Sequence, residues 1–175
     1  MRGGLALAAC ALALIASGAG SAHAATQRPT VFVAPFDLFD TAADQRPAIV
    51  ADQQRWLRHA AARIRADLDR AGRAKAVGTG ETLARMKRID ADYDHPSTCT
   101  SCLVAAARQA GAGFLFVGTL HRVSDLIVYM KAYLLDVRSG RELMARTFEV
   151  KSDDQLMLDR AADRMAAALE TRLKH

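Results

Sequence analysis

The feature that most constrains the fold is a pair of β-rich runs separated by only two residues. Residues 114–123 and 126–137 are rich in β-branched, aromatic and other apolar residues, and Ser124-Asp125 separates them. Two strands joined so closely pair as an antiparallel hairpin. A turn after the second run leads into a third run at 142–150, which predicts a three-stranded meander. Because residues 126–130 are apolar at every position, we expect the second strand to lie centrally with both faces covered.

Helical and β-type segments alternate before this meander. The long helix is predicted from apolar residues at helical spacing, with Trp56 as a core anchor and Gly72 as its stop. In chain order we expect a strand at 30–34 continued over 36–40, a helix at 47–71, a strand at 75–77, a helix opening at 79–81, a polar loop over 89–98 and a helix at 99–109.

A last helix follows the meander. Ser152-x-x-Gln155 is typical of a capping box, and apolar residues recur at helical spacing from there to Leu173. The element order is therefore β-α-β-α-α-β-β-β-α. This order predicts an α/β fold with a single mixed sheet and helices packed on it, within one domain over residues 30–175. A chain of this length buries a sufficient core without metals or disulfides.

The amino terminus has the layout of a secretory signal peptide. A positive start at Arg2 precedes an apolar stretch over 5–16 and a small-x-small site that ends at Ala24. We expect cleavage after Ala24, a short linker at 25–29 and a periplasmic mature protein. Residues 7–10 resemble a lipobox, but Cys10 lies inside the apolar stretch instead of closing it, so lipidation is not favoured. Outside this segment no run reaches the roughly 20 apolar residues of a membrane span.

The charge pattern does not indicate a nucleic-acid partner. The net charge is +5, and the arginines of the long helix are interleaved with aspartates. We interpret that helix face as solvated and salt-bridged, and we expect no nucleic-acid binding.

Cys99 and Cys102 form the one concentrated reactive feature. In an oxidising compartment a pair at this spacing forms a disulfide. At a helix start the same pair favours thiolate and could exchange disulfides. With His95 the two sulfurs could also hold a metal such as Zn²⁺, with Asp92, Asp94 or His121 as a further ligand. All three interpretations remain open, and the second and third define a thiol-disulfide or metal-handling protein as the alternative function.

Catalytic patterns are weak elsewhere in the chain. We find no Gly-x-Ser-x-Gly motif and no evident Ser/His/Asp set, so we expect neither catalysis nor a cofactor. A small hydrolase would need a cleft in which ionisable groups converge. Because loops on a rigid scaffold carry recognition, the predicted binding surface combines Asp94 and His95 with the hairpin tip, Ser124 and Asp125.

Three segments carry a resemblance to a known family: GAGFLFVG at 111–118, RVSDLI at 122–127 and LDVRSG at 135–140. They resemble a family of small secreted proteobacterial proteins of unknown function, in which a cysteine pair is common near residues 99–102. The element order is also similar to the amino-terminal domain of TolB and to the curli-secretion and penicillin-binding-protein-activator lipoproteins. This likeness implies a non-catalytic accessory or interaction module of the envelope, with an envelope protein as its partner.

Overall fold

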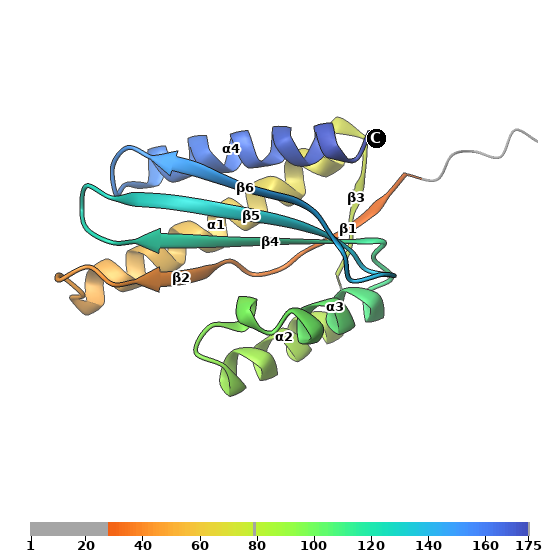
Figure 1. Cartoon of the computed structure of the whole chain (residues 1–175), viewed down its shortest axis with the longest axis horizontal. Helices are drawn as coiled ribbons and strands as arrows, with labels where there is room; N and C mark the ends of the chain where they lie inside the picture. Colours follow the sequence, from red (N-terminus) through yellow and green to blue (C-terminus); the bar gives the residue numbers. More distant parts are fainter. Residues whose placement is uncertain (1–27, 79, 175) are drawn as a thin grey trace, which may run out of the picture.

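One mixed sheet runs through the molecule and carries helices on both faces (Figure 1). The computed structural model describes residues 28–78 and 80–174, so the predicted signal peptide, its cleavage site and Cys10 lie outside the described residues. The elements are β1 (Thr30–Val33), β2 (Asp37–Asp40), α1 (Pro47–Ala71), β3 (Lys75–Ala76), α2 (Gly80–Asp92), the 3₁₀ helix η1 (Pro96–Thr98), α3 (Thr100–Gln109), β4 (Phe114–Arg122), β5 (Val128–Asp136), β6 (Glu142–Val150) and α4 (Gln155–Arg172). The predicted α/β class and element order are confirmed.

The first strand is interrupted, and its two halves pair in turn with β4. The sheet order is β3-β1-β4-β5-β6, and β2 pairs with β4 beyond the end of β1. Both halves run parallel to β4, whereas β4, β5 and β6 form the predicted antiparallel meander. The interruption falls at Pro35, which has no N–H to donate to a strand ladder.

One face of the sheet is covered by α1 and α4. The long helix begins at Pro47 and ends where Gly72 adopts a left-handed conformation with φ of 65°. Trp56 is half-buried at the edge of this layer. The buried side chains of this core come from both helices and from β1, β4 and β5: Val31, Val33, Leu57, Ile64, Leu68, Phe116, Leu120, Met130, Leu134, Leu158, Met165 and Leu169.

Several arginines of α1 pair with acidic side chains, as the charge pattern predicted, whereas Arg65 donates to the Val33 carbonyl at 2.7 Å. Arg55 and Arg70 bind aspartates one turn away on their own helix. Arg63 instead reaches Asp163, with Nε 2.5 Å from Oδ1, and so ties α1 to α4.

The second face of the sheet is only partly covered. In Figure 1, α2 and α3 lie beneath one end of the sheet, around β1 and the beginning of β4. There Phe32, Leu115 and Leu135 pack with Leu103 and Met86 into a second core. Further along this face Thr119 is buried, but His121 on β4 and the β5 side chains Tyr129, Lys131 and Tyr133 are only half-buried.

The hairpin between β4 and β5 differs from the prediction. Its loop covers residues 123–127, because the Ser124 hydroxyl accepts hydrogen bonds from the N–H groups of Leu126 and Ile127 and turns the chain there. Leu126 and Ile127 are 89% and 56% exposed. The two-residue turn and the strand covered on both faces were therefore wrong: β5 lies between two strands, but only one of its faces is fully covered.

Two helix boundaries also differ from the prediction. The polar segment that begins at residue 89 is still helical up to Asp92, since Ile89 is buried in the second core. The last helix is capped by Asp154, whose carboxylate accepts from the Met157 N–H, and Ser152 instead donates to Asp154. The predicted capping box is therefore wrong.

Candidate binding site

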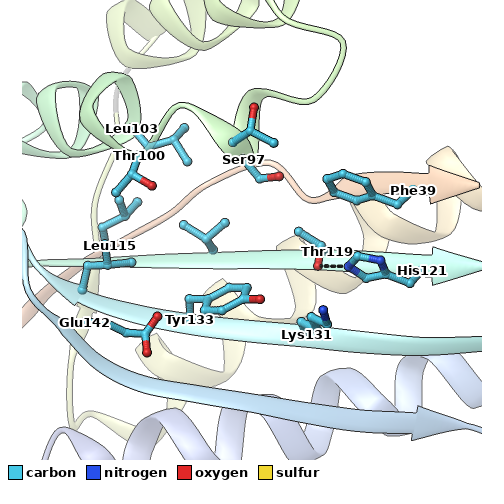
Figure 2. Close-up of a pocket in the computed structure, with 13 residues that line it drawn as sticks. Phe39, Ser97, Thr100, Leu103, Leu115, Thr119, His121, Lys131, Tyr133 and Glu142 are labelled. Carbon is cyan, nitrogen blue, oxygen red and sulfur yellow. Dashed lines mark hydrogen bonds between the residues drawn. The ribbon is translucent and has the colours of Figure 1, made fainter.

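A cavity of about 270 Å³ lies where the cover provided by α2 and α3 ends. Its floor is the second face of β4 and β5, and its roof is η1 with the start of α3 (Figure 2). Every second side chain along a strand points to the same face of the sheet, so β4 and β5 each contribute every second residue to the cavity floor. The lining consists of Phe39, Ser97, Thr98, Thr100, Leu103, Leu115, Val117, Thr119, His121, Lys131, Tyr133, Leu135 and Glu142.

A row of four stacked rings closes one end of this region. His121 is the register partner of Phe39 on β2 and of Tyr129 on β5. The ring centroids lie 4.7 and 4.9 Å from that of His121, and the planes differ by 6° and 5°. These distances match the spacing of neighbouring strands, so the strand register itself produces the row. His95, from the loop before η1, extends it with its ring 3.9 Å from Phe39.

The surroundings of His121 favour the neutral form of its imidazole. Partial burial lowers its pKa below the usual 6.5, and the positive charges of Lys131 and His95 lower it further. Its Nε2 lies 3.0 Å from the Thr119 hydroxyl. The ring is thus fixed by stacking on two sides and by one hydrogen bond.

The two ends of the cavity differ in chemistry. In Figure 2, Phe39, Thr119, His121 and Lys131 lie toward one end, and Leu103 and Leu115 lie toward the other. Val117 and Leu135 complete the apolar end. Glu142 is the register partner of Leu135, so a carboxylate stands at the apolar end and an ammonium group at the polar end.

Several polar groups of the cavity are free to bind. Lys131 contacts the Tyr129 ring, with Nζ 5.6 Å from its centroid, but no carboxylate of residues 28–78 and 80–174 forms an ion pair with it. Within the same described ranges, the hydroxyls of Tyr133, Ser97 and Thr100 donate no hydrogen bond to the protein. The cavity therefore presents one unpaired cation and three hydroxyls.

The segment that forms the roof is held by specific contacts. The Ser97 N–H donates to Asp37 Oδ2 at 2.6 Å, and this bond ties η1 to β2. Pro96 is buried, and the Thr98 hydroxyl donates to the His95 carbonyl at 2.7 Å. The roof is therefore attached to the sheet on the side of the ring row.

Cys99 and Cys102 form a disulfide at the edge of this roof, with their Cα atoms 5.3 Å apart. Cys99 precedes the first residue of α3, and Cys102 packs against the second core. Sulfurs bonded to each other offer no thiolate to a metal. Among the described residues, no group of three His, Cys, Asp or Glu side chains is arranged to hold a metal ion.

The hairpin tip makes its contacts on the opposite face of the sheet. Asp125 forms an ion pair with Arg122, whose side chain is 1% exposed. The same guanidinium lies 3.2 Å from Asp40 and 2.9 Å from Asp153, and it donates to the Asp44 carbonyl at 2.6 Å. Burial lowers the pKa of Arg122, but the Asp125 hydrogen bond and the other carboxylates outweigh burial and raise it. This cluster joins β2, β4, the hairpin and the start of α4.

Most of the chain matches the model of a known protein family. A family model described as "Protein of unknown function (DUF2380)" matches residues 29–169. The chain belongs to this family. The resemblance found in the sequence to a family of unknown function is thereby confirmed. No curated protein matches the chain in sequence.

Solved structures resemble this family member in fold alone. The hypothetical protein CT253 from Chlamydia trachomatis is similar at 9% identity with a TM-score of 0.50, over 84% of this chain and 99% of that one. Lipoprotein GNA1162 from Neisseria meningitidis is similar at 13% identity and a TM-score of 0.48, over 80% of this chain and 98% of that one. TolB from Acinetobacter baumannii has 14% identity and a TM-score of 0.48, and the chain covers 84% of its own length but 28% of TolB.

In this family member the predicted site residues fall into two groups. His95 joins the ring row beside the cavity, and Asp94 next to it is exposed. Ser124 and Asp125 serve the hairpin turn and the Arg122 cluster, so the structure does not bring them together with His95 in one pocket. Helices of the described region include none long and apolar enough to cross a membrane.

Most side chains of the cavity floor and of the ring row carry no signal in the sequence that singles them out. The sequence suggested His121 only as a possible metal ligand, and its patterns did not single out Phe39, Tyr129, Lys131 or Tyr133. They share the two-residue alternation along β2, β4 and β5, which places each of them on one face. Only the relative register of the strands, which the sequence does not state, shows that they meet.

Proposed function

We propose that this protein is an exported accessory module of the bacterial cell envelope, which binds a protein partner in the cavity and at its rim and catalyses no reaction. The observation that carries the proposal is the unpaired Lys131 in a cavity with free hydroxyls and an apolar end. Export and a periplasmic location belong to the proposal and rest on the signal-peptide pattern of residues 1–24.

The arrangement around His121 favours binding over catalysis. A general base needs a free nitrogen aimed at the reacting group and a partner that orients the ring. Here the ring lies between Phe39 and Tyr129, and its Nε2 is engaged with Thr119, a 4% exposed residue. Within residues 28–78 and 80–174, no carboxylate contacts the other nitrogen of His121. The ring therefore serves as a wall of the cavity.

A matched pair of rim variants tests this function. Thr100 lines the cavity, whereas the adjacent Ser101 is exposed and lies outside the lining. The exported protein, carrying a photo-crosslinker at Thr98, is captured from the periplasm of its own cells. We expect one partner to be recovered with wild type and with Ser101→Trp, and to be lost with Thr100→Trp. Equal recovery with both variants would contradict the proposal, as would turnover of a defined substrate that Thr100→Trp abolishes.

Disulfide exchange at Cys99 and Cys102 is a second candidate function. It is favoured by the position of Cys99 directly before α3, where the helix dipole stabilises a thiolate. Thiol titration of the protein isolated from the periplasm separates the candidates. A fully oxidised pair supports a structural disulfide, whereas a mixed population that follows the redox buffer supports exchange.

A further inference from the structure

We propose that the cavity recognises the carboxyl terminus of a polypeptide whose last side chain is apolar. The terminal carboxylate lies beside Lys131, and the last side chain lies against the leucine-lined end. This inference rests on the proposed function, because it names the chemistry of the partner that enters the same groove.

The polar end is suited to a single carboxylate. Lys131 is a half-buried cation without an ion-pair partner among the described residues, and burying a charge without a partner is unfavourable. In Figure 2, the Tyr133 hydroxyl points toward this end of the cavity, where Thr119 and His121 also lie. A carboxylate bound there gains charge-assisted hydrogen bonds, and such a bond raises the affinity about ten- to hundredfold.

The size and walls of the cavity fit one terminal residue. A carboxyl-terminal leucine has nine non-hydrogen atoms, and a cavity of about 270 Å³ is large enough to hold it. Its side chain would lie against Leu103, Leu115 and Val117, and each buried CH₂ group should tighten binding about fourfold.

The rim explains why a peptide suits this groove better than a fatty acid. Ser97 and Thr100 carry hydroxyls that make no hydrogen bond to the described protein, and they line the roof. A peptide that leaves the cavity offers these hydroxyls its backbone N–H and C=O groups, whereas an alkyl chain offers no polar group.

Glu142 at the apolar end should influence which last residue of a peptide the cavity accepts. It is the register partner of Leu135. Leu135 lies four positions from Lys131 on β5, which corresponds to about 13 Å between their backbone positions. A last residue with a carboxylate side chain would bring a second negative charge toward Glu142 and bury it among leucines. The cavity should therefore select against acidic last residues.

The test uses short acetylated peptides titrated into the purified protein and followed by calorimetry. The probes are acetyl-Ala-Ala-Leu as the free acid, the same peptide as the amide, and acetyl-Ala-Ala-Glu as the free acid. We expect the leucine acid to bind at least about tenfold more tightly than either of the others. In Lys131→Met, the acid and the amide should bind equally weakly, and Lys87→Met, which removes an exposed lysine on α2, should behave as wild type.

A second measurement tests the position of the carboxylate in the wild-type protein, so it does not depend on whether a variant folds. The His121 ring protons, followed by NMR across a pH titration, should show a higher pKa with the bound leucine acid, because its carboxylate offsets the charge of Lys131. The amide should leave that pKa unchanged. Thermal unfolding of Lys131→Met verifies that the variant is folded.

Three outcomes would overturn the inference: equal binding of acid and amide, no loss in Lys131→Met, or octanoate binding more tightly than the leucine acid, which would identify a fatty-acid site. If one of these occurs while Thr100→Trp still abolishes partner capture, only the ligand class is wrong. If Thr100→Trp leaves capture intact but blocks the peptide, the proposed function is wrong and the carboxylate site remains.

Discussion

Replacing Arg122 by methionine should cause the largest stability loss of any single substitution outside the hydrophobic core. The guanidinium is 1% exposed and pairs with Asp40 and Asp153, whose side chains are 8% and 13% exposed. Methionine has a similar length and fills the apolar part of the space. It leaves two carboxylates in a nearly buried position without their cation.

The magnitude follows from the burial of these partners. Removing one member of a buried ion pair typically costs about 3–5 kcal/mol, because the remaining charge loses both water and its partner. The lost hydrogen bond from Arg122 to the Asp44 carbonyl adds to this loss, although the two effects are not additive. Domains of this size are stable by about 5–15 kcal/mol, so about a fifth or more of the stability would be lost.

The assay is urea unfolding at neutral pH, followed by circular dichroism. Arg122→Met should move the midpoint strongly with little change in the m-value. Arg63→Met, which removes an exposed ion pair, should leave the midpoint nearly unchanged. Adding Asp40→Asn and Asp153→Asn to Arg122→Met should recover most of the loss, because the charges left alone are then gone. A loss below about 1 kcal/mol, or a further loss in the triple variant, would refute this reasoning.

Three more predictions follow from the structure. Gly118→Ala should destabilise the protein by about 1–3 kcal/mol, because its Cβ would lie 2.5 Å from the Phe36 ring. Thermal unfolding measures this loss, and adding Phe36→Leu to Gly118→Ala should restore stability. Since the folded state lowers the pKa of His121, stability should fall as the pH drops below about 6.5, where the unfolded chain takes up the proton first; His121→Phe should flatten this pH dependence of the urea midpoint. Cys102→Ser should cost about 2 kcal/mol, and reductant should lower wild type to the same midpoint without affecting the variant.

Sequence patterns predicted the parts of the fold that local chemistry determines. The helix at 47–71 has its observed bounds because Pro47 suits a first turn and Gly72 adopts the left-handed conformation that ends a helix. The antiparallel hairpin was confirmed, but its two-residue turn and the cap of the last helix were wrong because side-chain hydrogen bonds determine both. Ser124 closes the hairpin loop and Asp154 caps α4, and such residues form several alternative turns that composition alone does not distinguish.

The candidate site was less predictable because it depends on long-range register. His95 was selected for its place in a polar loop, and the structure brings it to the ring row only through Phe39, which lies 56 positions earlier in the chain. Lys131 carries no local signal at all. It is singled out because no carboxylate of the described part of the chain forms an ion pair with it, and that is a property of the folded surface.

The interruption of the first strand links the core to the cavity. Phe36 lies in the space above Gly118 that any larger residue would fill, and this contact sets where β2 resumes pairing with β4. The resulting register places Phe39 opposite His121. A slip of one residue would turn Phe39 toward α1 and α4 and remove it from the ring row, because strand side chains alternate between faces. The wall of the cavity therefore depends on a glycine that leaves room for the Phe36 ring on the opposite, fully covered face of the sheet.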